Sequence, residues 1–269
     1  MVSRQILQKT IEVIMVDKHS RMKVTTFLLT LVFLPHIILA QFSQGKITYE
    51  KTSYWAKIAQ RLPYLSQEEK DRSLLTNGSK EGWKSNYILH FDSTASILKK
   101  QVKSGSESAF GYSWREEDYL IYRNFKDSKK VDWIELLGKT YLIEEEYGRP
   151  KWKILNEIKE VAGYVCMKAE SFDTIKSQKI VAWFTDAIPV SSGPEQFYGL
   201  PGMILEINKN DGDVVIVATN IEFNIPNQVV KLPKLKGKKV TTPYFLDLVK
   251  AYIQESIKAQ RNPYWTVDY

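Results

Sequence analysis

The sequence predicts a mainly β fold of the α+β class: a curved antiparallel sheet or half-barrel with a short inserted helix and a C-terminal amphipathic helix. Three observations predict it. From Gly45 onward, apolar and polar residues mostly alternate with period two, as they do along half-buried strands. About ten such segments are separated by short polar turns rather than by helical crossovers. A long apolar stripe of helical period appears only near the end of the chain, after Thr242.

Length and composition fit one large or two small globular domains. The chain has 269 residues, of which 43% are hydrophobic and 12% aromatic, enough to bury a substantial core. Its formal charge is +7, and removal of residues 1–40 takes away five basic and two acidic residues, which leaves +4. So small an excess indicates an ordinary surface, and we expect no nucleic-acid partner.

Residues 22–40 have the layout of a secretory signal peptide. Lys23 precedes an almost wholly apolar run from Phe27 to Leu34, and Ala40 stands before a polar stretch. This run is shorter than the roughly 20 residues of a membrane span. We therefore predict cleavage after Ala40 and no membrane span after it, with an uncleaved N-terminal anchor as the alternative. The expected location is the periplasm or cell envelope, or outside the cell.

A polar stretch, residues 1–21, precedes this signal. Met15 and Met22 offer internal starts in addition to Met1. We interpret residues 1–21 as a non-native extension and Met22 as the true start. The alternative is an unusually long basic region at the head of the signal peptide.

The remaining elements follow in chain order. Strands are predicted within residues 46–55, 83–91, 95–101, 118–125, 129–137, 139–146, 149–158, 162–172, 178–186, 203–207 and 214–223. One helix interrupts them from Ser66 to Leu75, because Ser66 and Glu69 form a capping box and Asn77-Gly78 ends the segment. Together these elements make up a β-rich domain from residue 41 to residue 230.

A loop rich in glycine and proline precedes the strand at residues 203–207. Pro-Gly pairs favour a turn whose glycine has a positive φ, and a residue before proline is extended. We interpret the loop as a rigid corner that leads into a central hairpin, residues 203–207 and 214–223. The apolar start of the second strand predicts burial on both of its faces. The residues with this structural role are Gly193, Pro194, Gly199, Leu200, Pro201 and Gly202.

The last part of the chain is predicted to be a basic, solvated linker, residues 231–241, followed by a helix and tail, residues 242–269, that pack on the domain. Thr242 is the expected N-cap and Pro243 suits the first turn, while Asn262-Pro263 closes the segment. The helix is expected to cover one face or an open end of the sheet, with a partner-binding helix as the alternative. Its apolar stripe consists of Phe245, Leu248, Val249, Tyr252, Ile253 and Ile257.

The segment "GPEQFYGLPGMILEI", residues 193–207, resembles the signature of the GLPGLI family, exported proteins of Bacteroidetes-type bacteria whose domain is also named Porph_ging. "GKITYE", "PYLSQEEKDR", "AGYVCMKAE" and "VAWFTDAIPVSSGPEQFYGLPG" agree with the family in the same order, so the resemblance spans Gly45 to Ile225. Met203-Ile204 stands where the name-giving motif has Leu-Ile. The resemblance implies export and a β-rich fold. The family has no established activity, so it implies no catalytic residue.

Cysteine and histidine are scarce. Cys166 is the only cysteine, which excludes an internal disulfide and a CxxC redox motif. Beyond residue 40, His90 is the only histidine. A metal site with several histidines therefore cannot form there, and a serine triad would have only this one histidine as its base. We expect no cofactor and no metal. Cys166 is interpreted as a buried thiol in an apolar strand and His90 as a strand residue, with a Cys166–His90 dyad as the alternative.

Three carboxylates flank the glycine-rich corner: Asp186, Glu195 and Glu206. They could converge on a cation or serve as an acid/base pair. Glu206 could equally be the outward residue of an alternating strand. These residues, or the Cys166–His90 pair, would carry the alternative function, an envelope enzyme.

Aromatic residues are abundant, and most are expected in the sheet core. A subset lining a concave sheet could bind an apolar or sugar-like ligand, and Phe197 and Tyr198 beside the corner are the aromatics expected on display. The leading hypothesis is therefore a non-enzymatic binding or interaction module of the cell envelope, whose partner is an envelope protein or such a ligand. The tryptophans are Trp55, Trp83, Trp114, Trp133, Trp152, Trp183 and Trp265.

Overall fold

One sheet dominates the unit Ser43–Tyr269 in the computed structural model, which describes residues 44–100, 119–148, 150–225 and 230–269. Among these residues the sheet has twelve strands in the order β12-β6-β5-β4-β3-β2-β1-β11-β10-β9-β8-β7. All neighbours are antiparallel except β12 and β6, which are parallel. The strands are β1 (Gly45–Ser53), β2 (Trp83–Phe91), β3 (Ala95–Lys100), β4 (Tyr119–Asn124), β5 (Lys129–Leu136), β6 (Lys139–Glu146), β7 (Lys153–Val161), β8 (Tyr164–Asp173), β9 (Gln178–Thr185), β10 (Met203–Lys209), β11 (Val214–Phe223) and β12 (Lys238–Lys239).

The predicted fold class is confirmed: the described chain is mainly β, with two short helices and a C-terminal helix. The helices are α2 (Trp55–Arg61), α3 (Gln67–Asn77), α4 (Thr242–Lys258) and the short 3-10 helix η1 (Pro263–Trp265). The predicted signal peptide, the extension before it and Trp114 lie outside the described residues. Within the described part of the chain, no helix is long and apolar enough to cross a membrane.

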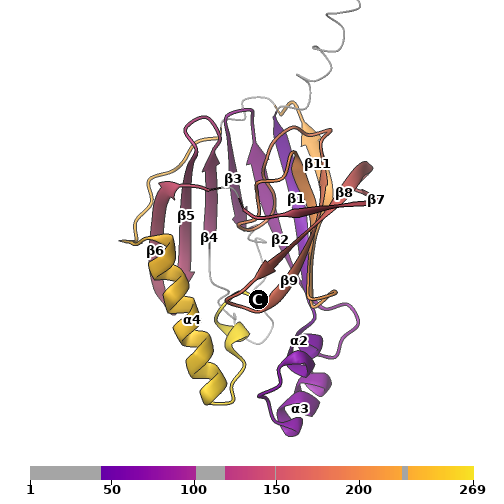
Figure 1. Ribbon diagram of the computed structural model, residues 1–269, viewed down its shortest axis with the longest axis vertical. Coiled ribbons are helices and arrows are strands. Elements are labelled where there is room, and N and C mark those ends of the chain that lie inside the picture. The colour runs from indigo at the N-terminus through magenta and orange to yellow at the C-terminus, as the bar shows by residue number, and fades with distance from the viewer. Residues whose placement is uncertain (1–43, 101–118, 149, 226–229) are drawn as a thin grey trace, which may run out of the picture. The chain divides into compact units, whose positions relative to one another are not determined.

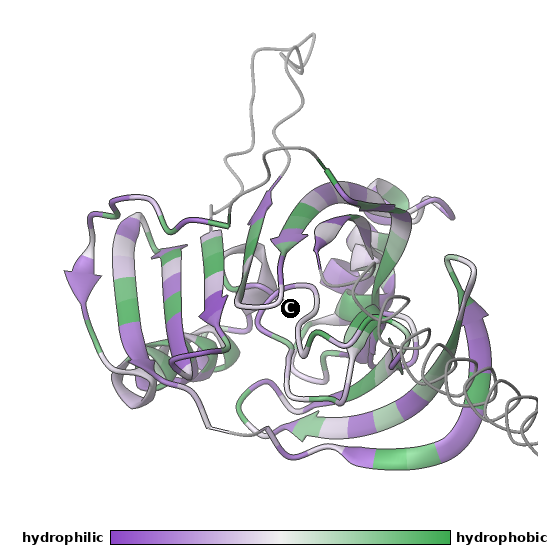
Figure 2. Cartoon of the chain, turned by 90° about the horizontal axis from the view of Figure 1, so that it is seen from above, coloured by the Kyte–Doolittle hydropathy of each residue, from purple (hydrophilic) through white to green (hydrophobic). Residues whose placement is uncertain are grey.

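The sheet is curved, and the end of the chain lies inside the curve (Figures 1 and 2). Strands β1 and β11 lie near its middle. On one side of them strands β2 to β6 form what we call the first arm, and on the other side strands β7 to β10 form the second arm. Helix α4 lies at the end of the first arm, where the Phe245 ring contacts the Tyr141 ring of β6 edge-on at 5.7 Å.

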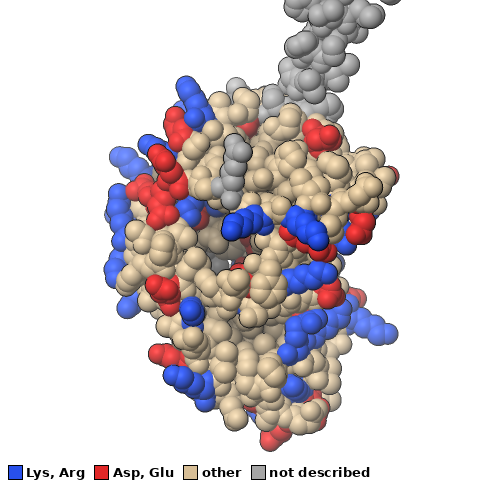
Figure 3. All heavy atoms as spheres, in the orientation of Figure 1, with Lys and Arg blue, Asp and Glu red and all other residues tan. Residues whose placement is uncertain are grey.

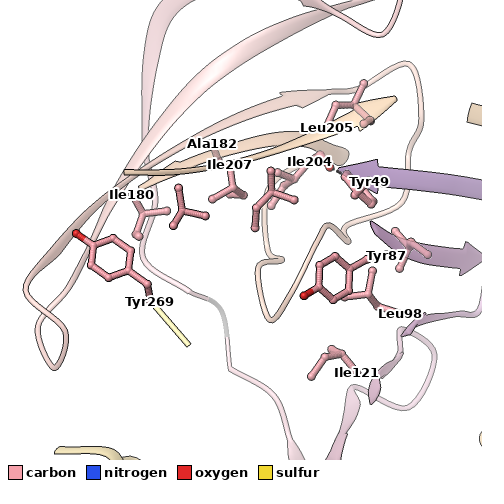
Figure 4. Close-up of a cluster of buried hydrophobic side chains, with 14 of the residues drawn as sticks. Tyr49, Tyr87, Leu98, Ile121, Ile180, Ala182, Ile204, Leu205, Ile207 and Tyr269 are labelled. Carbon is pink, nitrogen blue, oxygen red and sulfur yellow. Dashed lines mark hydrogen bonds between the residues drawn. The ribbon is translucent and has the colours of Figure 1, made fainter. Parts of the chain in front are cut away.

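The main hydrophobic cluster lines the inner face of this sheet. It includes Tyr49 of β1, Leu98 of β3 and Ile180 of β9, together with Tyr269 at the end of the chain. Figure 4 shows members of this cluster from both arms, with Tyr269 among them. Burial of such side chains contributes about 1.5–3 kcal/mol each. The two arms are therefore held on one shared core.

A second, smaller cluster lies on the opposite face of the first arm. Ile97 and Leu120 form it with Val230, and the Trp133 indole donates a hydrogen bond to the Lys236 carbonyl at 2.9 Å. Residues of the predicted basic linker therefore run along the outer face of the first arm and add β12 to its edge. The pairing of β12 with β6 was not apparent from the sequence, because two lysines carry no strand signal.

The helix α3 agrees with its sequence signals, whereas α2 was not predicted. The Ser66 side chain accepts a hydrogen bond from the Glu69 amide and the Glu69 carboxylate accepts one from the Ser66 amide, which confirms the capping box. Trp55, predicted to end a strand, instead begins α2. Ile58 and Leu62, four residues apart, are both buried, so the segment has a helical apolar face that the aromatic content obscured.

Helix α4 begins one residue earlier than predicted. Its N-cap is Thr241, whose hydroxyl accepts from the Tyr244 amide, and Thr242 is the first helical residue. Phe245, Val249 and Ile253 are buried as the stripe predicts. The assignment of Ile257 to the buried stripe was wrong, because this residue is 39% exposed. The helix ends at Lys258, and Asn262 caps η1 instead of closing α4.

The predicted central hairpin is present as β10 and β11, paired from Glu206↔Val217 to Lys209↔Val214. Burial of β11 on both faces was wrong, because burial alternates along the strand: Val214 and Ile216 are buried, while Val215 and Val217 are only partly so. One face of β11 contacts the main cluster. The other face is half-covered, and β-branched residues suit such a position as well as a core position.

Candidate functional site

The loop Gly193–Gly202, which we call the brace loop, connects the two arms of the sheet across the inner face. Gln196 donates a hydrogen bond to Asp132 of the first arm at 3.2 Å, while the Trp152 indole, just before the second arm, donates to the Tyr198 carbonyl at 2.8 Å. Its return is held by backbone bonds from Met203 to the Ile188 carbonyl and from Ile204 to the Ser192 carbonyl, at 3.0 and 2.9 Å. The predicted rigid corner is therefore a crossing that ties both arms together.

Glycine is required at the end of this loop. Gly202 has a φ of +143°, and a Cβ there would lie 2.1 Å from the Thr185 carbonyl oxygen. Gly199 has a φ of +92°, and its Cβ would lie 2.6 Å from Pro150. Only a residue without a side chain fits both the backbone angle and the space at these positions.

The aromatic candidates of the brace loop are partly buried and engaged with neighbours. The Tyr198 ring lies under the Arg123 guanidinium at 5.0 Å, and its hydroxyl donates to the Gly148 carbonyl at 3.0 Å. The Phe197 ring lies 6.2 Å from that of Trp152 and 5.7 Å from the Lys209 ammonium. The structure therefore places both rings between the loop and the sheet.

Glu195 occupies the most unusual position in the loop. It is buried, has a left-handed φ of +51°, accepts a hydrogen bond from Lys51 at 2.7 Å and forms an ion pair with Lys209 at 2.8 Å. Non-glycine residues adopt such backbone angles rarely, and strained residues concentrate at functional sites. The carboxylate joins β1 to β10 through the brace loop.

The last residues of the chain complete this cluster. Lys51 also donates to the Asp268 carboxylate, Lys176 donates to the Asp268 carbonyl, and Lys209 donates to the Tyr269 backbone oxygen. We call these four sheet and loop residues, Lys51, Lys176, Glu195 and Lys209, the tail site. Figure 3 shows that the face seen in Figure 1 is hollowed near its middle, with basic and acidic side chains around the hollow.

The Tyr269 phenol is held by a second set of polar groups. Its hydroxyl donates to Asp213 at 2.6 Å and accepts from the Asn210 amide at 2.6 Å. Arg61 of α2 donates to the Asp213 carboxylate at 2.5 Å and to the Asn210 carbonyl at 2.8 Å. The end of the chain is thus recognised at a carboxylate, at backbone oxygens and at a phenol.

Opposite charges keep Lys51 and Asp268 ionised. Burial alone would lower the pKa of Lys51, but Asp268 and Glu195 raise it well above its ordinary value. Burial alone would raise the pKa of Asp268, but Lys51, Lys209 and Lys176 lower it well below its usual range. Burial lowers the pKa of Lys176, and the charge of Lys209 lowers it further. Three lysines therefore face two carboxylates.

We expect stability to decline in acid through Asp268. A carboxyl whose folded pKa is depressed stabilises the protein fully above its unfolded pKa, about 3.9, and loses this contribution as the pH falls below it. Denaturant midpoints measured from pH 6 to pH 2.5 should fall in the wild type, most steeply below about pH 4. The variant Asp268→Asn should start lower and fall less. Parallel curves for the two proteins would contradict the assignment.

The three predicted carboxylates do not share one site in the structure. Glu195 binds Lys51 and Lys209, whereas Glu206 binds Lys159 at 2.6 Å and Asp186 is exposed. No group of three or more His, Cys, Asp or Glu side chains in the described residues is arranged to hold a metal ion. A shared cation site or an acid/base pair would require these carboxylates to lie together, and they do not.

Cys166 and His90 are also apart. Four strands lie between β2 and β8 in the sheet, which corresponds to about 24 Å along its curve. Cys166 is fully buried in the main cluster with Leu89 and Phe91, and alternation along β2 turns His90 to the other face. Burial raises the pKa of the Cys166 thiol to about 11, so the group is protonated at neutral pH.

The sequence interpretation missed the lysines of the tail site, although a signal for two of them was present. Lys51 continues the alternating inner face set by Ile47 and Tyr49, and Lys209 continues that of Ile207. A lysine in register with core residues is uncommon unless it is paired. Asp268 carries no such signal, because its partner Lys51 lies 217 residues away in the sequence.

Comparison with solved structures gives low overall similarity. Two structures described as PNGF-II, in space groups C2 and P21, have TM-scores of 0.49 and 0.47 at 14% and 15% identity, and the match covers 76% and 77% of this chain. The chain spans about a third of their length, since the match covers 32% and 33% of those chains. An uncharacterized conserved protein from Thermus thermophilus gives a TM-score of 0.35 at 6% identity, over 79% of this chain and 98% of that one. None of these similarities supports a functional statement.

Sequence comparison is more specific over one segment. No curated protein matches the chain. A family model described as "Protein of unknown function (Porph_ging)" matches residues 170–206. These residues run from the second half of β8 through β9 and the brace loop into β10. The resemblance to the GLPGLI family predicted from the sequence is thus confirmed over residues 170–206, which include the brace loop and match this family model of unknown function.

Proposed function

We propose that this protein is an exported, non-enzymatic binding module of the cell envelope, and that its inner face holds an extended polypeptide segment. The observation that carries the proposal is the tail site. Two buried lysines from β1 and β10, bridged by Glu195, and the partly buried Lys176 of the turn before β9 bind carboxylate and backbone oxygens of a segment that is not part of the sheet. Charged groups placed this way recognise a polypeptide without changing it.

A binding role fits the chemistry of the site better than catalysis does. Glu195 accepts a hydrogen bond from Lys51 on one oxygen and forms an ion pair with Lys209 through the other, so both oxygens face permanent partners rather than a reacting proton. The Cys166 thiol is buried and protonated. The rings of Phe197 and Tyr198 already contact protein groups, so a polypeptide partner is favoured over the apolar or sugar-like ligand.

Export is tested by the mass of the mature protein. Cells producing the full chain from Met22 should accumulate a protein whose N-terminal residue is Gln41, recovered from the envelope or periplasmic fraction. Affinity capture from that fraction, followed by mass spectrometry, should identify a retained polypeptide. A protein that keeps residues 22–40 and stays with the cytosol would overturn the proposal.

The reactivity of Cys166 separates the binding role from the cysteine-enzyme alternative. With a pKa of about 11, roughly one thiol in a thousand is ionised at pH 8. Iodoacetamide should therefore label the folded protein at least about 100-fold more slowly than the denatured protein. Labelling of the folded protein at the rate of a free thiol would favour a nucleophilic Cys166.

A further inference from the structure

The receptor part of the tail site consists of residues that lie outside the tail. Lys51, Lys209 and Glu195 stand on β1, β10 and the brace loop, and Glu195 bridges the two lysines at 2.7 and 2.8 Å. Their positions are set by strand pairing in the middle of the sheet, because β1 pairs with β2 and β11, and β10 pairs with β9 and β11. A departing tail would therefore leave an ordered site.

Charge gives the empty site a preference for acidic partners. Without Asp268, the three lysines Lys51, Lys176 and Lys209 would face the single carboxylate of Glu195. Buried charges left without partners are costly, so the site would favour any segment that restores a carboxylate at this point. Added salt would weaken this attraction, because it screens the solvent-exposed charges of the bound segment.

The tail covers the tail site from the solvent side. The Asp268 side chain is 47% exposed, whereas those of Lys51 and Lys209 are 7% and 3% exposed. Trp265 of the same tail is largely exposed and stacks on Trp55 of α2 at 4.5 Å. The residues that join the tail to α4, from Ala259 to Arg261, are exposed as well. The tail therefore lies over the site and is connected to α4 by an exposed link.

One buried hydroxyl, on β4, is incompletely satisfied. The Tyr119 hydroxyl is buried, and it makes no hydrogen bond of good geometry with the described residues. Burial raises its pKa, and Tyr87, Glu195 and Asp268 raise it further, so the hydroxyl is a neutral O–H donor at neutral pH. An incoming segment with one more acceptor would satisfy it.

We propose that the tail site accepts an acidic, extended segment of a second polypeptide, in which an aspartate precedes a tyrosine, in exchange for the chain's own Asp268 and Tyr269. The aspartate binds Lys51, backbone oxygens bind Lys176 and Lys209, and the phenol binds Asp213 and Asn210. The chain's own tail then acts as a built-in competitor that lowers the apparent affinity for the partner. This inference rests on the proposed binding function and names its ligand class.

The test uses the full chain and a labelled peptide with the sequence of residues 262–269, "NPYWTVDY". The double variant Asp268→Lys, Tyr269→Ala repels its own tail from the lysines and removes the phenol. Fluorescence anisotropy should show the peptide binding this variant at least about tenfold more tightly than the wild type. A peptide with asparagine in place of the aspartate should bind the variant at least about tenfold more weakly. Addition of Lys51→Met to the variant should remove binding.

Folding of each variant is checked by circular dichroism and thermal unfolding, and the milder Asp268→Asn replaces Asp268→Lys in any variant that does not fold. A folded variant that binds no peptide, or binds the aspartate and asparagine peptides equally, overturns the inference. Binding that occurs only together with dimerisation, measured by light scattering, assigns the site to tail exchange between copies and also overturns it. Export and a retained envelope polypeptide would still support the proposed function after either result.

Discussion

The variant Gly202→Ala should unfold at a temperature well below that of the wild type. A Cβ at this position would lie 2.1 Å from the Thr185 carbonyl oxygen and 2.7 Å from its carbon, both in the backbone of the neighbouring strand, which cannot rotate away. The φ of +143° is also one that residues with a side chain avoid. Backbone strain and overpacking each contribute about 1–3 kcal/mol, so we expect a loss of about 3 kcal/mol or more.

Gly163→Ala serves as the matched control for this substitution. Gly163 also has a positive φ, +82°, but nothing lies within 4 Å of the position that a Cβ would take there. The cost there should be about 1 kcal/mol, from the backbone angle alone. For a unit of this size, calorimetry should record melting-temperature losses of roughly 6–12 °C for Gly202→Ala and 2–4 °C for the control. Equal losses would mean that the crossing of the brace loop is not tightly packed.

The second large effect is expected for Lys51→Met, which keeps most of the length of the side chain and removes its charge. Glu195 and Asp268 would each lose their bond to Lys51, and Glu195 is buried. Removal of one partner from a buried ion pair costs about 3–5 kcal/mol, because the remaining charge stays in a poorly solvated place. Guanidinium unfolding curves should therefore show a markedly lower midpoint with an unchanged slope.

A lysine on the neighbouring strand provides the comparison for Lys51→Met. Lys84 of β2 binds Glu50 of β1 at 2.8 Å, but the two side chains are 53% and 30% exposed. Exposed pairs contribute about 0–1 kcal/mol, so Lys84→Met should change the midpoint little. Equal losses of stability in the two variants would mean that Lys51 contributes no more than an exposed ion pair does, which contradicts a buried binding site at this position.

Local patterns in the sequence predicted most of the fold. The alternation that defines β2, β6 and β11 placed these strands correctly, and Ser66 and Glu69 fixed the start of α3. The order of the strands in the sheet could not be predicted from the sequence. β1 pairs with β11 and β2, and nothing in the segment Gly45–Ser53 specifies a partner that lies about 170 residues later.

The candidate site was predictable only in part, because it also depends on the order of the strands in the sheet. The brace loop has a strong local signal in its glycines and prolines, and Glu195 within it was named as a candidate. Its partners Lys51 and Lys209 come from two strands that meet only through the sheet order. Burial of Glu195 and the rings beside it depends on the curvature of the sheet, which alternation does not encode.

The position of β1 also determines the sequence in which this unit can assemble. The earliest strand of the described chain lies inside the sheet, paired along its whole length with β11, from Gly45↔Phe223 to Ser53↔Val214. One long edge of β1 therefore has no strand partner until more than a hundred further residues have been synthesised. Asp268, which binds Lys51 of β1, is synthesised later still. Such distant pairings give a high contact order and slow folding. The chain is synthesised from its N-terminus onward, whereas the middle of the sheet is completed only when the first described strand pairs with β11, the last of its long strands.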